Sequence, residues 1–249
     1  LVKNIPYGSG LAGGVKNERW YQRHKDNNKT YVEWCVSWME EIFRVTKEGS
    51  LVAIFNNQKS LAYTQIALES VGFFMKDIIV YKRNSGIPKG FNLNSKLLKE
   101  GLPTDSITEH LHSSLLNQWE GICVVQKPIK GNFYKNYTNN GTGLFYTKDG
   151  DKFRSNILTD YKRNDSDKIS GHTTPKCSAL ISDLLLMLTH GNSETTVLDC
   201  FMGGGSTIIE SSKLGVKSIG IEMGKCEKKG HKYEGMDWTD VLVDQLGLE

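Results

Sequence analysis

The sequence lacks paired cysteines: its five cysteines are odd in number, widely spaced and free of any C-x-x-C motif. This usage disfavours a disulfide framework and a zinc site. It also lacks a run of about 18 apolar residues, the length that a membrane-spanning helix needs, because the longest candidate is interrupted at Ser182 and Asp183. No basic leader followed by an apolar stretch is present. We therefore expect a soluble, reduced, cytoplasmic protein without a membrane partner.

An excess of one charge sign is missing as well. The 31 Lys and Arg residues against 28 Asp and Glu residues leave a net charge of +3, which permits a nucleic-acid partner without requiring one. Apolar residues, in contrast, make up 38% of the 249 residues, enough to bury the core of one α/β domain. We expect a single domain over residues 1–249, and we expect the natural chain to continue upstream of Leu1, which is not a methionine.

Strands and helices alternate along most of the chain. Strands are predicted at residues 1–7, 51–55, 73–81, 121–126, 195–201 and 217–223. Helices are predicted at residues 31–45, 61–71, 175–188, 207–214 and 239–246, and a glycine-bearing basic loop at residues 8–30. This alternation predicts an α/β fold with a mostly parallel, doubly wound sheet. The strands at 73–81 and 121–126 are expected to pair as a hairpin with a long loop.

Two stretches interrupt the alternation. Residues 84–120 are basic with Gly and Pro punctuation, and residues 128–170 are polar, with glycines and scattered aromatic residues. Such composition is typical of irregular insertions and not of a second core. We expect both stretches to be recognition insertions on the single domain.

A glycine-rich turn follows the strand that ends at Asp199. Residues 203–205 are all glycine, which lets the backbone approach a ligand closely before a helix begins at Ser206. About 20 residues further on, Glu222 ends the next strand, where a carboxylate can accept the two hydroxyls of a ribose. The strand, turn, helix and second acid together predict a nucleotide pocket.

The same turn argues against two common nucleotide sites. A P-loop would need a lysine before Ser206, and a dinucleotide fold would need G-x-G-x-x-G; neither is present. Asp199 just before the turn would repel a diphosphate but would suit a cationic sulfonium or ammonium group.

Three motifs then resemble those of one family. Asp199-x-Phe201-x-Gly203-x-Gly205 resembles the S-adenosylmethionine motif of the amino-group (N6-adenine or N4-cytosine) DNA methyltransferases, and Asn4-Ile5-Pro6-Tyr7 is similar to their catalytic motif. His172-Thr-Thr-Pro-Lys176 is similar to their H-P-T-x-K element, and the order of the three is that of the β class. Ile5 stands where a proline is commoner, and Thr173 and Cys177 replace prolines in the third motif.

The resemblance implies a Rossmann-like, mostly parallel seven-stranded sheet with one antiparallel strand. Residues 1–249 would form one methyltransferase catalytic domain, with residues 84–120 and 128–170 as target-recognition insertions. The chemistry would be transfer of a methyl group from S-adenosylmethionine to adenine N6 in double-stranded DNA, after the target base has flipped out of the helix.

The catalytic roles implied by the family fall on the first motif. The side-chain oxygen of Asn4 and the carbonyl of Ile5 would accept the amino hydrogens of the base and concentrate electron density on its nitrogen. Pro6 would hold that carbonyl in place, and Tyr7 would stack on the flipped base. Asn4 and Asp199 should therefore be neighbours.

The cofactor contacts implied by the family involve more residues. Those expected to bind S-adenosylmethionine are Thr174, Lys176, Asp199, Phe201, Gly203, Gly205, Ser206 and Glu222. Thr174 and Lys176 would contact the carboxylate of the cofactor, and His172 is expected to be structural. The basic patches of the sequence, independently of the resemblance, predict contacts to DNA phosphates by Lys16, Arg19, Arg23, Lys82, Arg83 and Lys89. No metal site is expected.

Several alternatives stay open at this point. Cytosine N4 could replace adenine N6 as the target, the chain could be a non-catalytic nucleic-acid-binding subunit, or it could be an NAD- or ATP-using Rossmann enzyme. Cytosine C5 methylation is disfavoured, because that reaction needs a cysteine nucleophile and no Pro-Cys dipeptide occurs. A homodimer and a paired restriction enzyme are the further partners that the resemblance leaves open.

Overall fold

A computed structural model describes residues 20–84, 86, 90–162, 171–172 and 175–247, without the side chains of residues 20–28. The helices are α1 (Trp20–Val45), α2 (Leu61–Val71), α3 (Leu93–Lys99), the short 3-10 helix η2 (Thr108–His110), α4 (Phe133–Asn140), α5 (Ser178–Thr189), α6 (Ser206–Lys213) and α7 (Trp238–Leu246). The strands are β1 (Leu51–Asn56), β2 (Phe74–Lys82), β3 (Trp119–Gln126), β4 (Lys148–Asp149), β5 (Lys152–Phe153), β6 (Ile157–Leu158), β7 (Thr196–Asp199) and β8 (Lys217–Gly220). None of the helices in these ranges is long and apolar enough to cross a membrane.

The central sheet has four strands in the order β1-β3-β2-β6. β3 runs antiparallel to both of its neighbours, and β6 runs parallel to β2. The predicted hairpin of β2 and β3 is therefore confirmed. The register pairs Asn56 with Gly121 and Tyr81 with Glu120, so the carboxyl ends of β1 and β2 meet the amino end of β3 at one edge.

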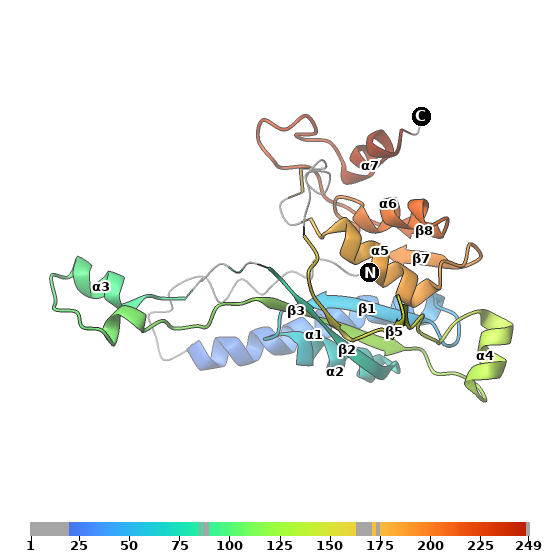
Figure 1. The fold of residues 1–249 in the computed structure, drawn as a ribbon, viewed down its shortest axis with the longest axis horizontal. Helices are drawn as coiled ribbons and strands as arrows, with labels where there is room; N and C mark the ends of the chain where they lie inside the picture. Colours follow the sequence, from blue (N-terminus) through green and yellow to red (C-terminus); the bar gives the residue numbers. More distant parts are fainter. Residues whose placement is uncertain (1–19, 85, 87–89, 163–170, 173–174, 248–249) are drawn as a thin grey trace.

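Helices cover both faces of this sheet, as Figure 1 shows: α1 and α2 lie on one face and α5 on the other. The alternation of side chains along a strand produces the two cores. On β1, Ile54 packs with α1 and α2, whereas Ala53 and Phe55 pack with α5. Because both faces are covered, the strands are nearly continuously apolar.

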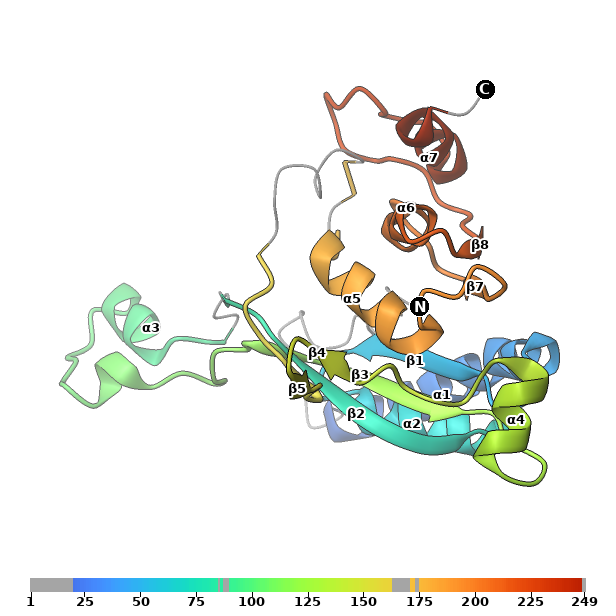
Figure 2. The same ribbon diagram turned by 45° about the vertical axis from the view of Figure 1, so that its right-hand side comes forward.

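β7 and β8 form a separate parallel pair beside α6, and α5 lies between this group and the central sheet (Figure 2). The α/β class is therefore confirmed. A seven-stranded sheet is not seen within the ranges given above. There, β1 is an outermost strand of the four-stranded sheet, and β7 belongs to the two-stranded sheet. The predicted strand at residues 1–7 lies outside those ranges.

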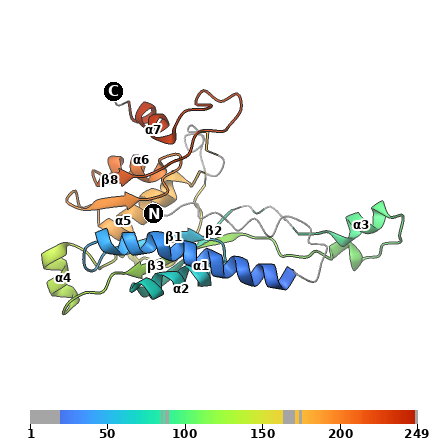
Figure 3. The ribbon, with the colours of Figure 1, turned by 180° about the vertical axis from the view of Figure 1, so that it is seen from behind.

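An arm, here the described residues 84, 86 and 90–117, projects from the body between β2 and β3 (Figures 1 and 3). It carries α3 and η2, neither of which has a buried residue. The predicted insertion at 84–120 thus ends earlier than expected, because Trp119 and Glu120 already belong to β3. At the root of the arm, the Arg83 N–H donates to the carbonyl of Gln118 at 2.7 Å.

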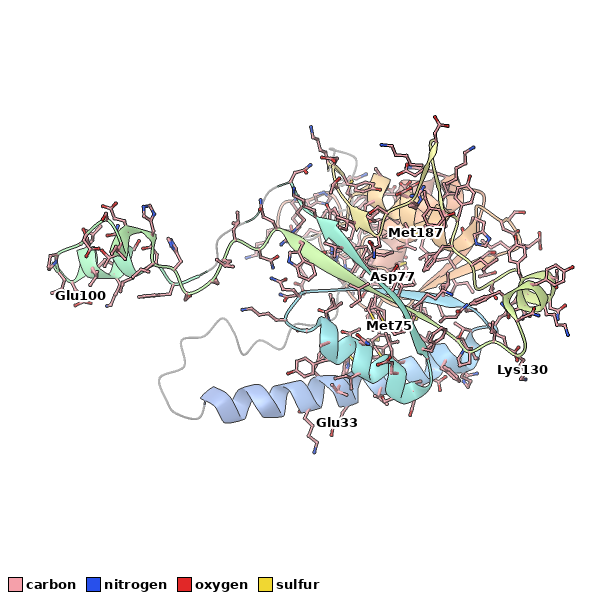
Figure 4. The ribbon with its side chains drawn as sticks, turned by 60° about the horizontal axis from the view of Figure 1, so that its bottom comes forward. Glu33, Met75, Asp77, Glu100, Lys130 and Met187 are labelled. Carbon is pink, nitrogen blue, oxygen red and sulfur yellow. The ribbon has the colours of Figure 1, made fainter. Side chains whose placement is uncertain are left out.

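The second predicted insertion, residues 128–170, is more ordered than its composition indicated. It contributes α4, the β4–β5 hairpin and β6, and Leu158 of β6 is 5% exposed within the main core. The expectation of a wholly irregular excursion was therefore wrong, because a short strand can join the edge of a sheet with little apolar periodicity of its own. Lys130 beside α4 and Glu100 on the arm mark opposite ends of the molecule (Figure 4).

Two further boundaries differ from the prediction. α1 begins at Trp20, so the loop predicted over 8–30 is wrong from residue 20 onward. The glycines of that stretch all precede residue 15, and residues 20–30 contain no Gly or Pro to interrupt a helix. α5 begins only at Ser178, three residues after Pro175.

Candidate functional site

The glycine turn lies where β7 meets α6. Asp199 pairs with Gly220 across the parallel strands, and the Ile221 N–H donates to the Asp199 carbonyl at 2.9 Å. The Gly205 N–H donates to the carbonyl of Met202 at 3.0 Å, and α6 begins at the next residue. The turn therefore joins the carboxyl end of a strand to the amino end of a helix, the place where open α/β sheets bind ligands.

The carboxylate of Asp199 is fully buried at 0% exposure. Its Oδ1 accepts the Phe201 N–H at 3.1 Å, whereas its Oδ2 has no hydrogen-bond partner among the residues that the structure describes. An unpartnered buried carboxylate oxygen is costly for a protein to maintain. It suits a ligand that brings a cationic group or a hydrogen-bond donor to this point.

Glu222 lies against the same turn. Its Oε2 accepts the Gly203 N–H at 2.9 Å, and its Oε1 accepts the N–H groups of Met223 and Gly224, each at 2.9 Å. A carboxylate offers about four acceptor directions. Three are therefore used to hold the turn, and Oε2 retains capacity for a ligand hydroxyl.

Two glycines of the turn are required by close packing. Gly203 has a φ of +52°, and a Cβ there would lie 3.0 Å from Nε2 of His172. Gly205 has a φ of +77°, and a Cβ there would lie 2.5 Å from Cδ1 of Leu242. Both positions thus demand glycine for their backbone conformation and for their neighbours.

His172 connects the H-x-T-x-K element to this turn. Its ring lies against Gly203 and packs on Trp238, with ring centroids 5.1 Å apart. The structure thus brings together two of the three sequence motifs. The packing supports the structural role expected of His172. Thr174 lies outside the described residues, so its role stays a prediction.

Lys176 lies where β1 ends and β3 begins in the central sheet. Its Nζ donates to Oε2 of Glu120 at 2.5 Å and lies 4.8 Å from the centroid of the Phe55 ring. The side chains of Lys176 and Glu120 are only 13% and 17% exposed. Glu120 was not singled out from the sequence. The available signal was an acid just before the predicted strand at 121–126, whose expected hairpin with 73–81 places this end beside the carboxyl end of β2.

Phe201 and Ser206 complete the predicted turn residues. The Phe201 ring packs on α1, with centroids 5.2 Å from Trp38 and 6.0 Å from Trp34, so it anchors the turn to the helix layer. Ser206 is half-buried as the first residue of α6. The hydroxyls of Thr207 and Ser211 on α6 are buried without a partner in the described part of the chain, a feature that the sequence did not indicate.

The catalytic motif, Asn4, Ile5, Pro6 and Tyr7, lies outside the described residues, and its proximity to Asp199 stays a prediction. The predicted phosphate contacts Lys16, Arg19 and Lys89, and the side chain of Arg23, lie outside as well.

Of the remaining predicted phosphate contacts, Lys82 is exposed at the end of β2. The Arg83 guanidinium donates to the backbone carbonyl and to the side-chain oxygen of Asn117, at 2.7 and 2.8 Å. It therefore braces the root of the arm in this structure. Across the described residues, no three His, Cys, Asp or Glu side chains gather as a metal site would require.

Comparisons with known proteins agree with the motifs. A family profile described as DNA methylase, of the N6/N4 type, matches residues 2–231. The type II methyltransferase M.HindIII of Haemophilus influenzae is 26% identical over 242 residues, 92% of this chain and 74% of that protein. The type II methyltransferase M1.MboII of Moraxella bovis is 26% identical over 211 residues, 80% of this chain and 76% of that protein.

Solved structures show the same fold. The M1.HpyAVI–SAM complex aligns with a TM-score of 0.58 and 20% identity over 90% of this chain and 85% of that one. The cytosine-N4-specific PvuII DNA methyltransferase aligns with a TM-score of 0.55 and 14% identity over 100% of this chain and 85% of that one. Together with the profile match over most of the sequence, the motifs lead to one conclusion: the chain belongs to the N6/N4 DNA methylase family, the amino-group DNA methyltransferases.

Proposed function

We propose that this protein is an S-adenosylmethionine-dependent methyltransferase that modifies adenine N6 at specific sites in double-stranded DNA. The observation that carries the proposal is the glycine turn with the buried Oδ2 of Asp199, which has no partner among the described residues, in a chain of the amino-group DNA methylase family. S-adenosylmethionine supplies the methyl group on a sulfonium centre. M1.HpyAVI, which shares the fold, is described in complex with SAM.

The residues at the turn fit such a cofactor. Asp199 and the glycines 203 and 205 would border its cationic end, and the free acceptor capacity of Glu222 would take a ribose hydroxyl. Phe201, Ser206 and Thr174 complete the proposed set. Lys176 would bind the cofactor carboxylate with the donors that its bond to Glu120 leaves over.

The proposed chemistry at the base falls to the first motif. Asn4 and the Ile5 carbonyl accept the amino hydrogens, Pro6 holds the carbonyl, and Tyr7 stacks on the flipped base. The proposal includes a seven-stranded sheet. Within the described residues, β1 pairs only with β3 and β7 pairs only with β8, so a further strand can pair with the free side of each.

DNA recognition is assigned to the arm and to residues 128–170. The arm follows directly after β2, whose last residue is Lys82, and projects from the body (Figure 1), so it offers a surface that a duplex can contact. The residues proposed to contact phosphates are Lys16, Arg19, Arg23, Lys82, Arg83 and Lys89. Because its relatives are type II methyltransferases, we also propose a cytoplasmic role together with either a paired restriction enzyme or a second copy of this chain.

Cytosine N4 is the second candidate target, favoured by the likeness to the cytosine-N4-specific PvuII enzyme. Methylated DNA can be digested to nucleosides and examined by mass spectrometry. The proposal expects N6-methyladenine, and N4-methylcytosine alone would replace it with the second candidate.

A non-catalytic subunit is separated by a different measurement. Incorporation of tritiated methyl groups into varied duplex DNA should be detectable for the wild type and absent for Asn4→Ala, whose cofactor affinity should stay within a few-fold of the wild type. Cofactor binding without any incorporation by the wild type would favour a binding subunit, and tight NADH binding without S-adenosylhomocysteine binding would indicate a different Rossmann enzyme.

A further inference from the structure

One carboxylate at the edge of the central sheet holds two cationic side chains. Oε2 of Glu120 accepts from Lys176 at 2.5 Å, and Oε1 lies 3.7 Å from a guanidinium nitrogen of Arg83. The shorter contact is also the less exposed one, since Lys176 is 13% exposed and Arg83 is 29% exposed. The stronger of the two interactions is therefore the one with Lys176, because a charge-assisted hydrogen bond gains from short distance and burial.

The position of Glu120 follows from the antiparallel direction of β3. Because β3 runs opposite to β1 and β2, its second residue lies where the other two strands end, with Glu120 paired to Tyr81. A side chain at the amino end of β3 thus reaches the ligand-binding edge of the sheet. A parallel strand in this place would put its second residue at the opposite edge.

Lys176 is constrained on a second side. Its ammonium lies 4.8 Å from the centroid of the Phe55 ring, which is itself 2% exposed. The backbone is anchored too, since His172 packs on Gly203 of the glycine turn and lies only four positions before Lys176 in the chain. Four residues span at most roughly 14 Å, so Lys176 stays within reach of a ligand bound at the turn.

An ammonium has three donors, and Glu120 is the acceptor that the described residues provide for it. A lysine side chain has several rotatable bonds, and fixing it costs conformational entropy. The contacts with Glu120 and Phe55 already restrict the lysine side chain before any ligand binds. The remaining donors are therefore presented in a defined direction.

We propose that Glu120 is a positioning residue for Lys176, fixing its ammonium to receive the carboxylate of the cofactor. The inference rests on the proposed function. It makes a selective claim: Glu120 matters only for ligands that carry the carboxylate, and only while Lys176 is present.

Calorimetry with two ligands tests the claim. S-adenosylmethionine and decarboxylated S-adenosylmethionine differ by the carboxylate alone. Glu120→Gln keeps the size of the side chain and removes its charge, and it should weaken binding of S-adenosylmethionine by about tenfold or more. Binding of the decarboxylated ligand should stay within about twofold. Glu194→Gln is the matched control: that carboxylate pairs with Lys217 and is exposed, so neither affinity should change.

A double variant keeps the test valid if the single change disturbs folding. Lys176→Met should lose S-adenosylmethionine affinity as Glu120→Gln does, and adding Glu120→Gln to it should change that affinity by no more than about twofold. Neutralising both members of a partly buried ion pair is tolerated better than removing one. Thermal unfolding of each variant reports whether the fold is intact.

The outcomes separate the inference from the function on which it rests. An equal loss of affinity for both ligands in Glu120→Gln would show a merely structural role. Unchanged affinity for S-adenosylmethionine in Glu120→Gln would overturn the inference. So would a further loss of that affinity when Glu120→Gln is added to Lys176→Met. A wild type that binds neither ligand would reject the proposed function as well. A wild type that binds S-adenosylmethionine while Glu120→Gln binds it normally would reject the positioning role alone.

Discussion

The buried carboxylate of Asp199 is the residue on which the proposed pocket depends most. One oxygen is used by the turn itself and the other is unpartnered within the described residues, so a ligand gains an interaction that water does not contest. We expect Asp199→Asn to lower the affinity for S-adenosylhomocysteine by about tenfold or more in calorimetry, because the charge on a buried acceptor is lost. Unchanged affinity of Asp199→Asn would show that the cofactor does not bind at this carboxylate.

Asp240→Asn provides the control for that variant. Asp240 is an exposed aspartate on α7, so its replacement changes the net charge equally without altering a buried group. Its cofactor affinity should match that of the wild type.

At the scale of an element, α7 is fastened through Asp244. This carboxylate accepts from the hydroxyl of Tyr233 and lies 3.3 Å from Nζ of Lys232. The hydrogen bond from Tyr233, aided by Lys232, lowers the pKa of Asp244 below the ordinary aspartate value. The stabilisation is therefore present above the pKa of the unfolded chain, about 3.9, and is lost as the pH falls through the lower folded value.

Thermal unfolding of Asp244→Asn checks this linkage. At neutral pH the variant should melt slightly below the wild type, since the group is exposed and its interactions are screened. The difference should shrink as both proteins are acidified below pH about 4. A difference that persisted unchanged in acid would show that the carboxylate charge is not responsible.

The arm is the second element that supports a prediction. It buries no residue of α3 or η2 and is closed at its root by Arg83, Asn117 and Gln118. Replacement of residues 85–116 by a short Gly/Ser loop should leave the melting temperature and cofactor affinity near those of the wild type while weakening binding to target duplex DNA. Electrophoretic mobility shifts measure the last effect. Unchanged DNA affinity would remove the arm from the recognition surface.

For the whole molecule, α5 is the element that unites the parts. Its buried side chains pack on the central sheet, and Val197 of β7 and Leu214 at the end of α6 pack against the same cluster. Leu184 is 0% exposed at the centre of this layer. We expect Leu184→Ala to lower the free energy of unfolding by about 2–5 kcal/mol in urea titration, because the cavity cannot collapse.

The matched control is Ile66→Ala on α2, where the side chain is 54% exposed and little packing is lost. In urea titration, the central sheet and the segment around the glycine turn are expected to unfold in one shared transition. Two separate transitions would show that α5 does not couple them.

The sequence predicted the local elements well where periodicity and punctuation agree. The helix at 61–71 ends at Gly72 as expected, with a φ of 112°, and the glycine turn between β7 and α6 is where it was predicted. Prediction failed where neither signal was strong. The start of α1 at Trp20 was missed beside a glycine-rich stretch, and β6 was missed because two residues show no period.

The sequence by itself determined the chemistry at the turn, because Asp199, the glycines and Glu222 lie in one strand–turn–helix unit and a following strand whose geometry is local. Only the tertiary structure decided the neighbours: His172 on Gly203, Phe201 on α1, and Glu120 beside Lys176. Residues 120 and 176 are distant along the chain. The hairpin of β2 and β3 was expected, but the packing of Lys176 against the amino end of β3 was not, because it depends on contacts across the whole molecule that no local pattern encodes.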